Sequence, residues 1–119
     1  IRFALMIARM CAHCWFDDIV TIKWWDDLWL TQGFAAFMSY YCLEGIKDQV
    51  TTIPTFSSAW KMFLPELANA FKEDQFDNTH PVKPVDQVSN TSMAAAYSDS
   101  ISSAKGLAVL KQLMFIIGE

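Results

Sequence analysis

Apolar side chains recur every three or four residues in four segments of the chain, a spacing that places them on one face of an α-helix. The segments span about 3–16, 30–45, 57–71 and 102–117, so we predict four helices. Pro65 falls inside the third segment and is expected to kink or split that helix, because proline removes a backbone donor and crowds the preceding turn. The apolar positions of the pattern are Phe3, Ile7 and Met10; Phe34, Phe37, Met38 and Tyr41; Trp60, Phe63, Leu64, Leu67 and Phe71; and Leu107, Leu110, Leu113, Met114 and Ile117.

The segments between these helices have the composition of connections. Residues 72–92 are rich in Asp, Asn, Ser and Thr and contain Pro81 and Pro84, so we predict a loop. Residues 17–25 pass from acidic to β-branched to aromatic side chains, which favours an extended connection. Few segments alternate apolar and polar residues with period two. The predicted fold is therefore mainly α, and any sheet that its core needs must come from elsewhere.

The composition indicates a packed core. Of the 119 residues, 53% are hydrophobic and 18% are charged, which excludes disorder for most of the chain. The net charge of -4 argues against nucleic-acid or anionic-membrane partners, and no apolar run approaches the roughly 18 residues of a membrane span. The chain starts at Ile1 without a methionine and stops inside an apolar helical pattern, so we expect a fragment of one domain. Its three cysteines are an odd number and indicate no disulfide framework. They do not identify the cellular compartment, but unpaired cysteines favour a reducing one such as the cytoplasm.

A spacing of four residues on the first predicted helix points to a possible metal site. Two residues four apart on a helix lie on one face and can bind one metal ion, as the two histidines of His-Glu-x-x-His do in zinc peptidases. In those enzymes the glutamate of the motif is the general base, and a glutamate from a later helix is the third ligand. The corresponding segment here reads Arg9-Met10-Cys11-Ala12-His13, and Gln32 follows His13 after eighteen intervening residues.

The surrounding residues resemble the zinc-binding core of the M1-family aminopeptidases, the aminopeptidase N group of gluzincins. The family pattern is His-Glu-x-x-His-x-Trp-Phe-Gly, then Lys-Trp-Trp-Asn/Asp-Asp-Leu-Trp-Leu-Asn-Glu-Gly-Phe-Ala, and the resemblance runs from Leu5 to Leu43. Residues 79–81 and 99–106 resemble two further blocks, Ser/Thr-His-Pro and Asp-x-Ile-Thr/Ser-Tyr-x-Lys-Gly, so the resemblance covers nearly the whole chain. The matching residues of the first block are His13, Trp15, Phe16, Val20, Thr21, Lys23, Trp24, Trp25, Asp27, Leu28, Trp29, Leu30, Gly33, Phe34 and Ala35.

The resemblance implies a fold and a set of site positions. The fold is expected to be part of the thermolysin-like, mainly helical catalytic domain, without the sheet that carries the family's Gly-x-Met-Glu-Asn motif. Arg9 and Gln32 stand at two of the three zinc-ligand positions, and His13 is the one ligand kept. Met10 stands where the family has its general-base Glu, and Ser103 where it has the Tyr that stabilises the tetrahedral intermediate. No intact catalytic residue remains at these positions.

These substitutions predict a chain without bound zinc, the cofactor of the family. A guanidinium repels a divalent cation, an amide oxygen is a poor zinc ligand, and a thioether has no proton to move. We therefore expect an inactive M1-like domain that serves as a scaffold or binds peptides or protein N-termini. We also expect Arg9 to project into the vacated metal pocket and to hydrogen-bond Gln32 or an acidic residue from outside the chain.

Two alternative functions remain open. The first is an active zinc metallo-aminopeptidase that removes N-terminal residues from peptides and whose site residues are altered or misreported in this sequence. The second is a helical interaction domain without a ligand pocket. Substrate preference, oligomeric state and whether the substitutions are natural are not readable from the sequence.

Other chemistry-bearing residues favour structural interpretations. Cys11, His13 and Cys14 lie close together but lack the second ligand pair of a zinc motif. The tryptophans of the first block are expected to fill a core between helices rather than to form a ligand platform. His80, beside Pro81, is interpreted as a turn residue rather than as a catalytic base.

Overall fold

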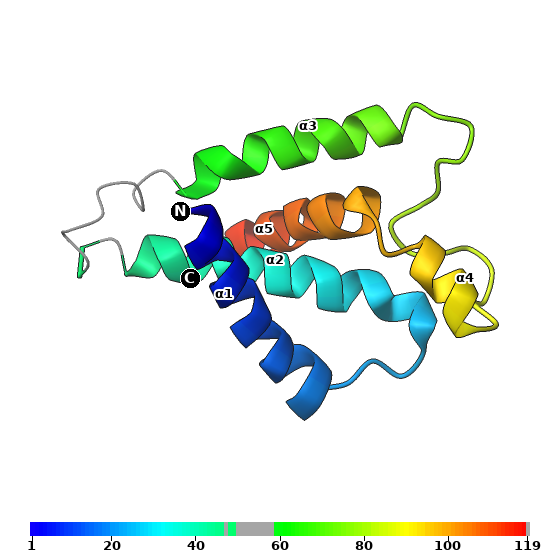
Figure 1. Cartoon of the computed structure of the whole chain (residues 1–119), viewed down its shortest axis with the longest axis horizontal. Helices are drawn as coiled ribbons and strands as arrows, with labels where there is room; N and C mark the ends of the chain where they lie inside the picture. Colours follow the sequence, from blue (N-terminus) through cyan, green and yellow to red (C-terminus); the bar gives the residue numbers. More distant parts are fainter. Residues whose placement is uncertain (47, 50–58, 119) are drawn as a thin grey trace.

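The computed structural model describes residues 1–46, 48–49 and 59–118, and these residues form helices joined by loops, without a strand (Figure 1). None of the described helices is long and apolar enough to cross a lipid bilayer. In chain order the elements are α1 (Arg2–His13), the π-helix η1 (Cys14–Ile19), the 3₁₀ turn η2 (Trp25–Asp27), α2 (Leu28–Gly45), α3 (Phe63–Glu73), α4 (Thr91–Ala96), the π-helix η4 (Ile101–Lys105) and α5 (Gly106–Ile117).

Helix α2 is the centre of the fold. It packs against α1, α5 and η4, and α3 packs against η4 from the other side (Figure 1). Small residues along α2 allow this close packing, because they leave room for the neighbouring helices. The buried cluster that results consists of Leu5, Ala36, Phe37, Tyr40, Leu43, Ala59, Phe63, Ala70, Ala104 and Leu107.

The first predicted helix differs from the structure at its end. Regular α-helix stops at His13, and the chain continues as a π-helix through Ile19. The backbone N–H of Val20 donates to the carbonyl of Trp15 at 3.0 Å, a bond across five residues that marks the wider turn. The extended connection predicted for 17–25 therefore begins only at Val20. Apolar spacing does not distinguish these two helix types over one turn.

The third predicted helix is divided in the structure. Residues 57 and 58 lie outside the described part of the chain, residues 59–62 form a 3₁₀ turn, and α3 begins at Phe63. Pro65 consequently lies in the first turn of α3, where its missing N–H would have had no partner within the helix. The change from 3₁₀ to α-helix close to Pro65 agrees with the predicted split of this helix.

The predicted loop over 72–92 is too long at both ends. Helix α3 continues to Glu73, and the short helix α4 begins at Thr91. The Asn90 side chain accepts a hydrogen bond from the backbone N–H of Met93 at 2.9 Å and caps α4. The predicted last helix, about 102–117, consists of η4 followed by α5.

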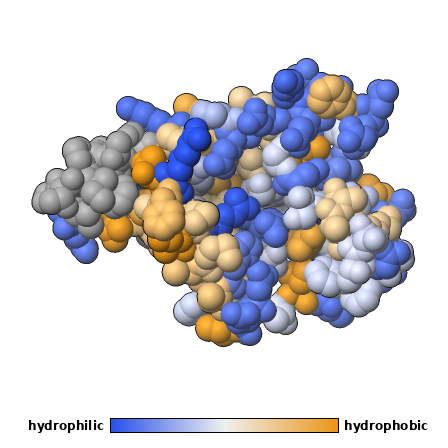
Figure 2. Space-filling model, in the orientation of Figure 1, coloured by the Kyte–Doolittle hydropathy of each residue, from blue (hydrophilic) through white to orange (hydrophobic). Residues whose placement is uncertain are grey.

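The apolar stripe predicted for the first helix points outward. Phe3, Ile7 and Met10 are exposed, and Leu5 is the buried residue of α1. Figure 2 shows apolar side chains gathered over the α1 side of the face in view. The periodicity therefore identified an apolar helix face, but among the described residues nothing covers that face.

Candidate functional site

Arg9 and Gln32 face each other across the contact between α1 and α2. The Arg9 Nη2 donates a hydrogen bond to Gln32 Oε1 at 3.3 Å, and both side chains are partly buried. Arg9 lies in the third turn of α1 and Gln32 in the second turn of α2, so the packing of these two helices sets the pair. The hydrogen bond that the sequence led us to expect is therefore present.

The pair lines a polar cavity of about 400 Å³. Ser103, presented by the π-helix η4, lines the same cavity as Arg9 and Gln32. Met10 does not line it and is 60% exposed on the outer side of α1. The structure thus brings together three of the five positions selected from the sequence, namely Arg9, Gln32 and Ser103.

His13 is engaged with a neighbour on its own segment. Its Nδ1 lies 2.6 Å from Asp17 Oδ2, four residues further along in η1. An Nδ1–H that donates to this carboxylate leaves Nε2 as the ring nitrogen available to another ligand. No pairing of Asp17 with His13 was predicted from the sequence. The spacing of four between a histidine and an aspartate was the signal that could have identified this pair.

Glu66 and Asn69, on α3, are site residues that the sequence did not indicate. Both line the polar cavity with Arg9 and also line a second cavity of about 470 Å³ between α1, α2 and α3. Tyr40 forms part of the second cavity, and its hydroxyl is buried without a hydrogen bond of good geometry. Burial raises the pKa of Tyr40, and the nearby Glu66 carboxylate raises it further. Tyr40 therefore carries a neutral hydroxyl across the physiological pH range.

His80 has a structural position. Its Nδ1 lies 2.8 Å from the carbonyl oxygen of Pro81, and its Nε2 lies 2.7 Å from Asp99 Oδ2. The other carboxylate oxygen of Asp99 accepts from the backbone N–H of Ser102 at 2.9 Å and so holds the start of η4. Both ring nitrogens of His80 are thus engaged, Nδ1 within its own turn and Nε2 with the carboxylate that holds the segment presenting Ser103. This arrangement agrees with a turn residue rather than a catalytic base.

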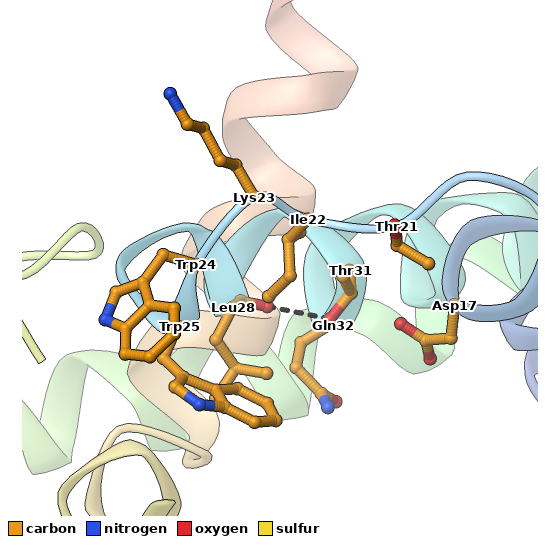
Figure 3. A pocket seen from close by; sticks show the side chains of 9 residues that line it. All are labelled: Asp17, Thr21, Ile22, Lys23, Trp24, Trp25, Leu28, Thr31 and Gln32. Atoms are coloured by element: carbon orange, nitrogen blue, oxygen red, sulfur yellow. Dashed lines mark hydrogen bonds between the residues drawn. The ribbon is translucent and has the colours of Figure 1, made fainter. Parts of the chain in front are cut away.

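The tryptophan-rich segment forms one wall of a cavity of about 500 Å³ (Figure 3). Trp24 and Trp25 lie at one end of the labelled side chains, Asp17 lies at the other, and Gln32 lies between them (Figure 3). Trp24 is 45% exposed, so it does not fill a core among the described residues as expected. Gln32 borders this cavity as well as the polar one and therefore stands between them.

The Trp24 indole fixes a distant loop instead. Its Nε1 donates to the carbonyl oxygen of Val88 at 2.6 Å, and the Val88 N–H donates to Asp26 Oδ1 at 2.6 Å. In the same loop, the Lys83 Nζ lies 2.7 Å from Asp27 Oδ1. The hydrogen bond to this carboxylate raises the pKa of Lys83. These contacts hold the loop after α3 against the segment that begins α2.

The cysteines do not complete a metal site. In the described part of the chain, no group of three or more His, Cys, Asp or Glu side chains is arranged to hold a metal ion. Cys11, Cys14 and Cys42 are free and exposed.

Comparison with known proteins places this geometry in context. The profile of the "Peptidase family M1 domain" matches residues 2–119. The chain is 35% identical to "Probable aminopeptidase 1" of Saccharolobus solfataricus over 99% of its length and 14% of that protein. It is 39% identical to "Tricorn protease-interacting factor F2" of Thermoplasma acidophilum over 92% of this chain and 13% of that one. It is 37% identical to "Puromycin-sensitive aminopeptidase" of Caenorhabditis elegans over 99% of this chain and 12% of that one. The chain spans about one-seventh or less of the length of these relatives.

Proposed function

The chain belongs to peptidase family M1, and on that premise we propose that it is a catalytically inactive, peptide-binding form of the family's helical catalytic region. The observation that carries the proposal is the hydrogen bond from Arg9 to Gln32. Family resemblance assigns both positions to zinc ligands. Here the two side chains are hydrogen-bonded to each other.

The donor set does not fit zinc. Zinc in proteins is held by thiolate, imidazole and carboxylate groups that are deprotonated. Arg9 remains a cation at all accessible pH values, and the Gln32 oxygen already accepts the Arg9 hydrogen bond. His13 is then the sole conventional ligand of the three, and its ring is fixed by Asp17. Loss of a partner outside the ligand shell costs about 10–100-fold in metal affinity, so loss of two direct ligands costs more.

Catalysis fails on separate grounds. Met10 replaces the general-base glutamate, and its thioether can neither accept nor deliver a proton at neutral pH. Ser103 reaches the polar cavity with a much shorter side chain than the tyrosine it replaces. Removal of one donor to a developing oxyanion costs about 10²–10³ in rate, and this loss adds to the missing base. No step of peptide hydrolysis can be assigned to these residues.

Peptide binding is supported by the cavities that remain. Gln32 and Arg9 lie at the junction of three cavities of about 400, 470 and 500 Å³, within the range of ligand pockets in proteins. Their walls combine aromatic surface from Trp24 and Trp25 with the polar groups of α3 and η4. Such walls can bind a side chain and the polar backbone of an extended peptide.

The second candidate function is an active zinc aminopeptidase. The observation that favours it is that relatives with 35–39% identity are named as aminopeptidases or as a protease-interacting factor. It requires that the residues at the zinc-ligand positions, Arg9 and Gln32, be altered or misreported in this sequence.

One pair of measurements separates the two functions. Metal analysis of the purified full-length protein is expected to give far less than one zinc per chain. Hydrolysis of leucine p-nitroanilide is expected to stay at the background rate, and added zinc is not expected to raise it. Stoichiometric zinc together with hydrolysis that a chelator blocks would reject the inactive form.

A further inference from the structure

Two opposite charges face the same pair of cavities without neutralising each other. Arg9 and Glu66 both line the 400 Å³ cavity and the 470 Å³ cavity. Within the described residues, the ion pairs present involve other side chains, and Arg9 and Glu66 form none with each other. A guanidinium carries five N–H donors, and the bond to Gln32 uses one of them.

We propose that this pair of charges binds a free α-amino acid as its zwitterion, with the carboxylate on Arg9 and the ammonium group on Glu66. The proposal names the ligand class of the proposed inactive site and rests on that site being free of zinc. A guanidinium matches a carboxylate with two parallel hydrogen bonds, and charge-assisted bonds of this kind are the strong ones in proteins.

The mixture of charges selects against other ligands. A phosphate dianion would gain from Arg9 but would be repelled by the Glu66 carboxylate in the same cavities. A simple amine would gain from Glu66 but would be repelled by Arg9 and, in the 470 Å³ cavity, by Arg2 as well. A ligand that carries an ammonium group and a carboxylate on one carbon atom can bind both residues, and the α-amino acid is the common molecule of that kind.

The lining of the 470 Å³ cavity indicates which amino-acid side chain the ligand should carry. Besides the charged residues Arg2, Arg9 and Glu66, its lining includes Leu5, Met6 and Met62, which offer an apolar wall. The Asn69 amide borders both cavities and can bond either end of the zwitterion. An apolar amino acid such as leucine therefore fits better than a basic one, which Arg2 and Arg9 would repel.

Isothermal titration of the purified full-length protein with three matched ligands tests the inference. L-leucine carries both charges, N-acetyl-L-leucine lacks the ammonium group, and L-leucinamide lacks the carboxylate. Leucine is expected to bind, and each analogue is expected to bind about tenfold more weakly or worse. Equal binding of all three ligands, or no binding of leucine at millimolar concentration, would overturn the inference.

Two substitutions assign the ends of the ligand. Arg9→Gln should weaken leucine and N-acetyl-leucine and leave leucinamide unchanged, whereas Glu66→Gln should weaken leucine and leucinamide and leave N-acetyl-leucine unchanged. Lys61→Gln and Asp77→Asn remove the same charges at exposed positions that line none of these cavities, so both should bind leucine as the parent does. Equal losses in the control variants would overturn the assignment.

Metal analysis of the same sample separates this inference from the proposed function. Stoichiometric zinc overturns both proposals. Zinc-free protein that does not bind leucine overturns the amino-acid site alone.

Discussion

Gly33 of α2 and Gly106 of α5 bring two helices into direct backbone contact. A Cβ atom built on Gly33 would lie 2.8 Å from the carbonyl carbon of Gly106, closer than real Cβ contacts occur. The obstacle is backbone, so it cannot rotate away as a flexible side chain would. Gly33 is in the second turn of α2, the turn that also carries Gln32. The close approach of α5 therefore helps to fix the helix that presents the site.

Gly33→Ala is expected to destabilise the fold. The methyl group must push α2 and α5 apart, and overpacking of this kind costs about 1–3 kcal/mol in unfolding free energy. Gly45→Ala is the matched control, because nothing lies within 4 Å of a Cβ atom at Gly45, at the other end of α2. The control should be neutral or slightly stabilising, since alanine is the better helix former. Equal unfolding free energies for the two variants in urea titrations would contradict this account of the helix contact.

Restoring the family's ligands should restore zinc binding. The triple variant Arg9→His, Met10→Glu, Gln32→Glu supplies an imidazole and a carboxylate at two positions whose side chains already meet. With His13 this completes a set of two imidazoles and one carboxylate, which holds about one zinc per chain in metallopeptidases. Metal analysis after dialysis against zinc measures the gain.

The controls separate ligand identity from surface charge. Gln32→Glu alone should form an ion pair with Arg9 and bind no zinc, because the guanidinium stays in place. Addition of His13→Ala to the triple variant should remove the bound metal. If the triple variant stays metal-free while it remains folded, the Arg9–Gln32 pair does not occupy the former metal position.

The sequence predicted the helices best where apolar spacing was long and regular. The expected helix over 30–45 corresponds to α2, Leu28–Gly45, because apolar residues recur through it over several turns without a proline. The short helix α4 was missed, because six residues give too few repeats to show a period and its Asn90 cap lies in a polar stretch. The π-helical turns were missed because they differ from α-helix by one residue per turn.

The candidate site was predictable in part for a related reason. Arg9 and Gln32 were found because family resemblance assigned both positions to one site, and the structure adds the bond between them. Glu66 had no such signal, because it lies in an amphipathic helix where a charged residue is ordinarily solvated. Its importance depends on α3 lying beside the Arg9 cavity, which is a property of tertiary packing.

Trp24→Phe should loosen the loop after α3. The indole N–H is the donor to the Val88 carbonyl, and phenylalanine keeps most of the ring surface while it removes that donor. Val88 is fully buried, so its carbonyl would lose its partner at a cost of about 1–3 kcal/mol. Hydrogen exchange of the loop amides should rise in the variant.

Trp15→Phe provides the comparison for that experiment. Trp15 is 60% exposed, and the structure gives its indole no hydrogen bond, so the substitution should leave loop exchange unchanged. The same exchange rates in both variants would show that the indole bond does not hold the loop.

The last prediction concerns the acid side of the stability profile. The Lys105 ammonium, followed by the Thr79 hydroxyl at 2.7 Å, lowers the pKa of Asp74 below its usual value. The unfolded chain then binds this proton more readily than the folded chain does. The stabilisation is fully present above the unfolded pKa and is lost as the pH falls through the lowered, folded value.

Asp74→Asn should therefore make the free energy of unfolding depend less on pH in the acid range. Asparagine keeps the shape and can still bond Thr79, but it carries no charge for Lys105, so unfolding midpoints should depend less on pH below about 5. Asp77→Asn removes an exposed carboxylate that makes no ion pair in the described part of the chain, so this variant should keep the parent's pH dependence. Thermal unfolding from pH 7 down to pH 3 measures both variants. If the unfolding midpoints of the parent and of Asp74→Asn change with pH to the same extent, the Asp74–Lys105 ion pair between the end of α3 and η4 does not contribute to stability.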